Sequence, residues 1–129
     1  MKYSISNIAW SAEYDNEMYA FLKKQGIDGI EIAPTRLFVN PYDNLELAHE
    51  YAWMLKNKYG LTVSSMQSIW YGIKESIFGT EEEKNKSIEA IRKAYEYAEK
   101  IDEADNLIAN HIGEGIFNKE GWQYILDRI

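Results

Sequence analysis

The fold is decided by the stretch Leu61–Glu83, LTVSSMQSIWYGIKESIFGTEEE. Its first seven residues, 61–67, have the composition of a β-strand, and an aromatic, glycine-bearing loop follows them. The TEEE motif at 80–83 is a capping box, in which the Thr80 hydroxyl and the Glu83 carboxylate each accept a hydrogen bond from the other residue's backbone amide. The stretch therefore predicts one βα unit, with a helix that runs to about Ile101.

Two further βα units precede this one. The first has a strand over 2–8 and a helix over about 16–25, which we expect Asp15 to cap and Gly26 to stop. The second has a strand over 29–33, GIEIA, and a helix over about 44–59, which we expect Asp43 to cap. Apolar side chains recur at helical spacing in both helices, so one side of each is predicted to pack on a core.

A fourth unit follows the central stretch. Its strand is predicted over 106–110, NLIAN, and its helix from Asn118 onward. The tryptophans of predicted helices, Trp53 and Trp122, are expected in the core. Four strands and four helices in strict alternation, with no linker between them, predict a single α/β domain over 1–129 with a parallel sheet. This alternation fits an open doubly wound sheet as well as half of a (β/α)8 barrel.

Composition excludes several classes of protein. The 129 residues include no cysteine, so disulfides and thiolate metal sites are absent. The net charge is −7 without a basic stripe, which argues against a nucleic-acid partner. No secretion signal and no apolar run of about 20 residues is present, which predicts a soluble, cytoplasmic protein with no membrane partner. No glycine-rich phosphate-binding motif follows the first strand.

Several motifs carry a resemblance to a known family. They are SNIAW at 6–10, GIDGIEIAP at 26–34, MQSIWYG at 66–72, FGTEEE at 78–83 and, more loosely, NHIG at 110–113. In order and spacing they resemble the N-terminal half of the xylose isomerase-like TIM-barrel superfamily, the sugar and sugar-phosphate isomerases and epimerases. The resemblance implies a (βα)4 half-barrel, a truncated form of the (β/α)8 TIM barrel.

The resemblance also implies a type of chemistry. Family members use a divalent metal (Mn, Mg, Co or Zn) to polarise a carbonyl, while two glutamates move a proton at the neighbouring carbon. Their metal ligands come from strands five to eight, which this chain lacks. The chain is therefore expected to supply a substrate-binding half with no catalytic residue and no metal ligand. The alternative is a non-catalytic half-barrel that acts as a carbohydrate-binding or assembly module.

Five residues at the predicted carboxyl ends of strands are candidates for substrate binding: Trp10, Glu31, Gln67, Trp70 and His111. The two tryptophans could stack on the apolar face of a sugar or simply pack over the end of the sheet. Glu31 could bind sugar hydroxyls or pair within the barrel, and Gln67 could bind hydroxyls or tie down its own loop. His111 could contact a sugar oxygen or serve ordinary polar packing.

The expected ligand is a small-molecule sugar or sugar phosphate. Its phosphorylation state is not predicted, because phosphate sites in such barrels usually follow strands seven and eight. Arg36, after the second strand, could meet an anionic group, but a solvated loop residue is the usual case and is expected here. A four-stranded piece of a barrel leaves two unpaired strand edges, so we expect a fragment of a longer protein, pairing with a second copy, or a small open sheet.

Overall fold

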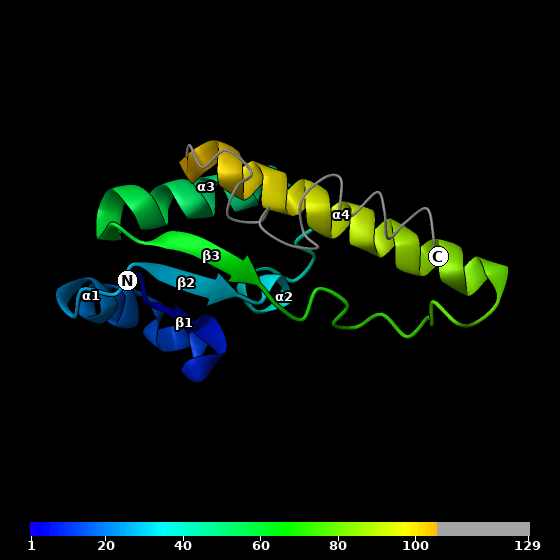
Figure 1. Ribbon diagram of the computed structural model, residues 1–129, viewed down its shortest axis with the longest axis horizontal. Helices are drawn as coiled ribbons and strands as arrows, with labels where there is room; N and C mark the ends of the chain where they lie inside the picture. The colour runs from blue at the N-terminus through cyan, green and yellow to red at the C-terminus, as the bar shows by residue number, and fades with distance from the viewer. Residues whose placement is uncertain (106–129) are drawn as a thin grey trace.

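A computed structural model describes residues 1–105, with side chains through Glu103. The predicted strand at 106–110, His111 and the predicted last helix with Trp122 lie outside the described residues. The described elements are β1 (Ser4–Ser6), η1 (Asn7–Ala9), η2 (Ala12–Tyr14), α1 (Asp15–Lys24), β2 (Gly29–Ile32), α2 (Pro34–Leu37), α3 (Glu46–Met54), η3 (Leu55–Tyr59), β3 (Thr62–Met66) and α4 (Glu81–Asp105), shown in Figure 1.

The three strands form one parallel sheet in the order β1-β2-β3. Ser6 of β1 lies beside Glu31 of β2, which lies beside Ser65 of β3. The α/β class and the parallel sheet are thus confirmed for the described part of the chain. The fourth βα unit and the half-barrel remain predictions.

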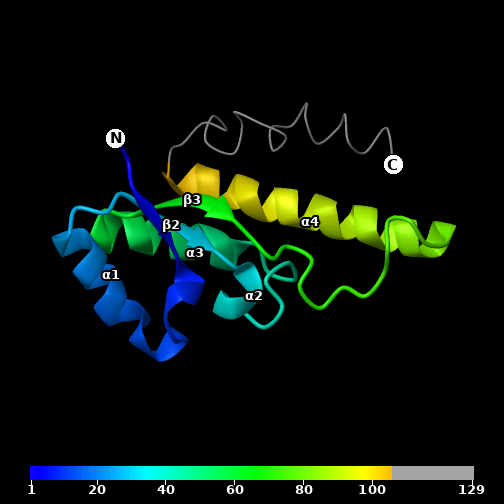
Figure 2. The same cartoon turned by 60° about the horizontal axis from the view of Figure 1, so that its bottom comes forward.

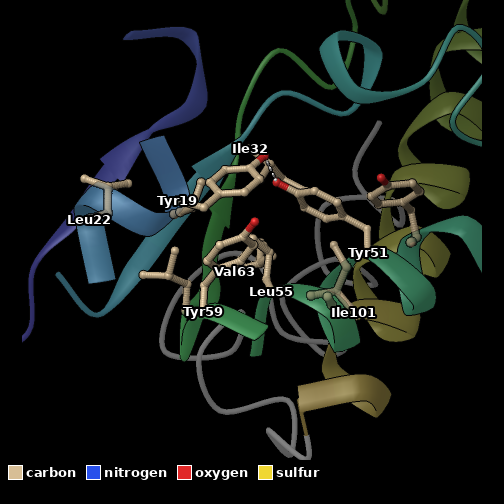
Figure 3. Packing of buried hydrophobic residues seen from close by; sticks show 13 residues of the cluster. Tyr19, Leu22, Ile32, Tyr51, Leu55, Tyr59, Val63 and Ile101 are labelled. Carbon is tan, nitrogen blue, oxygen red and sulfur yellow. Dashed lines mark hydrogen bonds between the residues drawn. The ribbon is translucent and has the colours of Figure 1, made fainter. Parts of the chain in front are cut away.

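The helices build the core on one face of the sheet. Ile30, Ile32 and Val63 point to this face and are buried there. Helices α3 and α4 lie side by side along it, in contact with each other in both views (Figures 1 and 2). Figure 3 shows how α1 and η3 contribute side chains to the same cluster, with Leu22 and Leu55 among them. The apolar side chains of α3 and α4 therefore pack where their sequence period predicts, whereas Phe21, on the predicted apolar side of α1, is 52% exposed.

The capping box is confirmed at the start of α4. The Glu83 amide donates to the Thr80 hydroxyl at 3.2 Å, and the Thr80 amide donates to the Glu83 carboxylate at 2.8 Å. The helix continues beyond Ile101 to Asp105. Two amides that the helix itself leaves without partners are satisfied in this way, which explains why the helix begins here.

Other predicted boundaries are wrong in informative ways. Asp15 does not cap α1, because its carboxylate accepts hydrogen bonds from Trp10 and Arg36 instead. Tyr14 occupies the N-cap position, and its side chain makes no capping hydrogen bond. Asp43 does not cap α3 either, since that helix begins only at Glu46. Trp53 was expected in the core, yet it is 56% exposed, because α3 turns Ala48, Ala52 and the following Leu55 inward instead.

Tyrosines make up much of the core. The hydroxyls of Tyr19 and Tyr51 share a buried hydrogen bond of 2.7 Å, drawn as a dashed line in Figure 3. Tyr59 packs edge-on against Tyr19 with ring centroids 5.5 Å apart, and Tyr42 packs edge-on against Tyr97 at 5.7 Å. Within residues 1–105, the buried Tyr97 hydroxyl has no hydrogen-bond partner. The core thus contains both a satisfied and an unsatisfied phenol.

This contrast predicts opposite effects of the same substitution. Tyr97→Phe is expected to leave the free energy of unfolding unchanged or to raise it, because it removes a buried hydroxyl without a partner. Tyr51→Phe is expected to lower it by about 1 kcal/mol, because Tyr19 loses its partner. Urea denaturation of both variants measures the difference. A larger loss for Tyr97→Phe than for Tyr51→Phe would contradict the described packing.

The same core predicts sensitivity to alkali. Burial raises the pKa of Tyr19 to about 12 and that of Tyr42 to about 12. A raised folded-state pKa means that stability is fully present below pH 10, the ordinary tyrosine value, and is lost as the pH rises toward 12. The raised pKa of Tyr19 alone should cause the free energy of unfolding to fall by roughly 1 kcal/mol as the pH rises from 9 to 10.5. Denaturation across that range tests it, and a flat profile would contradict it.

Candidate functional site

The second face of the sheet is polar. We call it the polar face and define it by the side chains Ser4, Ser6, Glu31, Ser64, Ser65 and Gln67. None of these six belongs to the apolar cluster, and five of them are half-buried while Ser4 is exposed. Parallel sheets ordinarily have both faces covered by apolar side chains. A polar second face is therefore typical of a barrel interior or of a binding surface.

A β-bulge in β3 aims its side chains at this face. Opposite the step from Ile30 to Glu31, β3 advances from Val63 to Ser65, so that Ser64 is the extra residue. A bulge of this kind reverses the alternation of the residues that follow it. Ser64 and Ser65 consequently both lie on the polar face, and Gln67 returns to it after the half-buried Met66 packs on the core.

The carboxyl edge of the polar face contains two hydrogen-bonded pairs of side chains. Ser65 donates to Oε2 of Glu31 at 2.8 Å, and Nε2 of Gln67 donates to the hydroxyl of Ser6 on the far side of β2. We call these residues the edge cluster: Ser6, Glu31, Ser65 and Gln67. Within residues 1–105, Oε1 of Glu31 and Oε1 of Gln67 accept no hydrogen bond, so the cluster presents two acceptors to a ligand.

At the other end of the polar face, the absence of a side chain at Gly29 lets the side chains of Ser4 and Ser64 come close together. The hydroxyls of Ser4 and Ser64 hydrogen-bond to each other across this glycine. A Cβ at position 29 would lie 3.1 Å from the Thr62 carbonyl oxygen and 3.3 Å from the Ser64 Cβ. Glycine is needed here for the close approach of two neighbouring strands rather than for an unusual backbone angle.

Trp10 is held in place by Asp15 and Arg36. Its Nε1 donates to Asp15 at 2.8 Å, and the same carboxylate oxygen forms an ion pair with Arg36 at 2.8 Å. Arg36 also donates to the Trp10 carbonyl at 3.0 Å and lies over the Trp10 ring, 5.8 Å from its centroid. Arg36 is therefore largely buried and paired, contrary to the expected solvated loop. The packing interpretation of Trp10 gains support, and its sugar contact stays a prediction.

Asn7 fixes the carboxyl ends of two strands to each other. It is fully buried, and its Oδ1 accepts a hydrogen bond from the Ala33 amide at 3.0 Å. Its Nδ2 has no partner among the described residues. The bond joins the chain after β1 to the chain after β2, so Asn7 sets the spacing of the strand ends that carry Ser6 and Glu31.

The loop after β3 places Trp70 next to a groove. The loop runs alongside α4 in both views (Figures 1 and 2), and Trp70 is 42% exposed. The neighbouring residues Ile69, Tyr71 and Ile73 line a groove of about 380 Å³ between this loop, the chain after α2, and α4. Trp70 is not among the groove's lining residues, so its predicted role in stacking stays open.

The described residues do not fit the metal that the resemblance implies. Among residues 1–105, no group of three or more His, Asp or Glu side chains lies close enough together to hold an ion. Glu31 is paired with a serine rather than with further carboxylates or imidazoles.

No helix of the described part is long and apolar enough to cross a membrane.

Comparisons with family models, curated proteins and solved structures find no significant match to this chain. Membership of the sugar isomerase superfamily consequently remains a prediction from the motifs.

The structure thus brings together two of the five predicted residues, Glu31 and Gln67, on one polar surface. Ser6 and Ser65 were not singled out as site residues, although each bonds directly to one of these two. The adjacent serines Ser64 and Ser65 could have indicated the bulge from sequence, because two neighbouring polar residues interrupt the alternation of apolar and polar side chains in a strand.

Proposed function

We propose that this chain is the sugar-binding portion of an α/β isomerase or epimerase that resembles the xylose isomerase-like type. The observation that supports this proposal is the edge cluster, in which Glu31 and Gln67 lie on the polar face at the carboxyl end of a parallel sheet. Ligands of parallel α/β proteins bind at this end of the strands.

The hydrogen-bonding pattern suits a polyhydroxylated ligand. The Glu31 carboxylate is oriented by Ser65 through one oxygen, which leaves the other oxygen to accept from a hydroxyl group. Gln67 is oriented by a hydrogen bond that its own Nε2 donates to the Ser6 hydroxyl, and it offers its carbonyl oxygen. Two fixed acceptors on neighbouring strands could bind two hydroxyls of one sugar, which is how polar groups fix a ligand's orientation.

The proposal assigns binding rather than a chemical step to these residues. The chain alone is expected to bind a sugar without converting it.

Isothermal titration calorimetry of the whole chain tests the proposal. The titrants are aldoses and ketoses of five and six carbons, each beside its phosphate ester, with a sugar-free polyether of similar size as the negative control. We expect saturable binding of at least one sugar. If no sugar binds while the protein melts cooperatively, the proposed function is wrong.

A further inference from the structure

Strand β1 forms an edge of the sheet, and its outer side has no strand partner among the described residues. Its only neighbouring strand there is β2, as Figure 1 shows. The backbone of Tyr3 faces β2, because its amide donates to Oδ2 of Asp28 at 2.8 Å and its carbonyl accepts from the Asp28 amide at 2.9 Å. Backbone groups alternate in direction along a strand, so those of Lys2 and Ser4 face outward. The edge therefore offers hydrogen bonds to another strand.

The side chains along this edge are exposed and mostly uncharged. Tyr3 is 56% exposed and Ile5 is 37% exposed, although the register places Ile5 beside the fully buried Ile30 of β2. Between Lys2 and Glu13 the sequence has neither a charged side chain nor a proline. Charged side chains and prolines are the usual devices that prevent pairing at a sheet edge. The three residues of β1 contain neither, so only the shortness of the strand limits pairing.

The edge is complementary to a second copy of itself. In an antiparallel pair centred on Ser4, the two Ser4 residues lie opposite each other and exchange hydrogen bonds through their outward-facing backbone groups. Tyr3 then lies opposite Ile5 of the second copy, and Ile5 lies opposite Tyr3 of the second copy. These side chains share the core face of the sheet, so each pair covers apolar surface that is exposed in the single chain.

The same register brings opposite charges together. Lys2 alternates with Tyr3 and therefore shares the polar face, where it would lie opposite Ser6 of the second copy. Ser6 lies beside Glu31 in the sheet. The Cα atoms of Lys2 and of Glu31 in the second copy are then two strand spacings, about 10 Å, apart, a distance that two extended side chains of these types span. Among the described residues, Lys2 takes part in no ion pair.

From these observations we propose that two copies of this chain pair through antiparallel β1 strands, with Lys2 of each copy beside the edge cluster of the other. The pairing joins two three-stranded sheets into one and brings a cation from the second copy to each edge cluster. A carboxylate has several acceptor positions, so Glu31 can accept from this lysine and from a ligand hydroxyl together. Strand pairing requires no ligand, and the inference is independent of the proposed function.

Analytical ultracentrifugation over a range of protein concentrations tests the pairing. The contact between two short strands is small, so we expect a weak dimer with a dissociation constant on the order of 10 µM. Lys2→Glu should raise this constant about tenfold, because attraction to Glu31 becomes repulsion at two symmetric places. Adding Glu31→Lys to the same chain should recover most of the loss. Lys24→Glu, at an exposed position at the end of α1, changes the net charge equally and should have no effect.

Cysteine cross-linking tests the register, because the chain has no cysteine of its own. Opposite Cα atoms of a hydrogen-bonded antiparallel pair lie about 5.5 Å apart, which is within the range of a disulfide. Ser4→Cys should therefore oxidise to a covalent dimer. Ser11→Cys, at an exposed serine outside β1, should remain monomeric under reducing gel-free conditions of the same oxidation.

The remaining outcomes each contradict a stated part of the proposal. A wild-type chain that stays monomeric up to about 100 µM overturns the pairing. A dimer that Ser11→Cys cross-links and Ser4→Cys does not has its interface away from β1. Equal dissociation constants for Lys2→Glu and Lys24→Glu overturn the contact with Glu31, and this comparison does not depend on how well Ser4→Cys folds. Failure to bind sugar changes none of these results, so it contradicts the proposed function alone.

Discussion

Glu31→Ala is expected to weaken sugar binding by about 10- to 100-fold, because it removes a carboxylate acceptor worth roughly 1.5–3 kcal/mol to a bound hydroxyl. The side chain lies on the polar face, where Ser65 donates to one of its oxygens at 2.8 Å and, within residues 1–105, the other oxygen accepts no hydrogen bond. Because Glu31 does not belong to the apolar core, the fold should remain intact. Calorimetric dissociation constants for the wild type and the variant measure the effect.

Two control variants sharpen this prediction. Glu50→Ala removes an exposed carboxylate from α3, on the helix side of the molecule, and is expected to leave affinity unchanged. Ser65→Ala keeps the Glu31 carboxylate but removes the hydroxyl that orients it, so a smaller loss is expected. An affinity of Glu31→Ala equal to that of the wild type would place the binding site away from the edge cluster.

Leu55→Ala is expected to lower the free energy of unfolding by about 2–5 kcal/mol, the range for a large core side chain that is cut back to alanine. Leu55 is 0% exposed and belongs to the cluster between the sheet and the helices. Domains of this size are marginally stable, so such a loss is expected to lower the melting temperature by several degrees. Urea denaturation measures it.

Trp53→Ala is the matched control for this substitution. Trp53 lies two residues earlier in the chain and is larger, but it is 56% exposed. Its replacement should change the free energy of unfolding by no more than about 0.5 kcal/mol, as is usual at surface positions. A greater loss for Trp53→Ala than for Leu55→Ala would mean that α3 presents the opposite side to the core.

Local patterns in the sequence predicted much of the fold. The capping box at Thr80, the strand at 29–33 and the glycine stop at Gly26 all depend on neighbouring residues, and the structure agrees with them. Helix starts were less predictable. Asp15 has the side chain of a good cap, but its carboxylate binds Arg36, which is distant in sequence.

The site was only partly predictable for the same reason. Glu31 and Gln67 were identified because they stand at strand ends, where parallel sheets bind ligands. Their partners depend on the register between strands: Ser6 and Gln67 meet across β2, and the bulge at Ser64 decides which side chains share a face. The register between strands joins residues that are far apart in the sequence, so local patterns do not reveal it and Ser6 and Ser65 were not identified.

The most direct test of the central claim, that sugar binds on the polar face at its carboxyl edge, is a map of amide chemical shifts. The labelled whole chain is titrated with the tightest-binding neutral sugar and followed by heteronuclear NMR. We predict that the largest changes occur at Ser6, Glu31, Ser65 and Gln67. Changes confined to the helix side, at α1 and α3, would contradict the account.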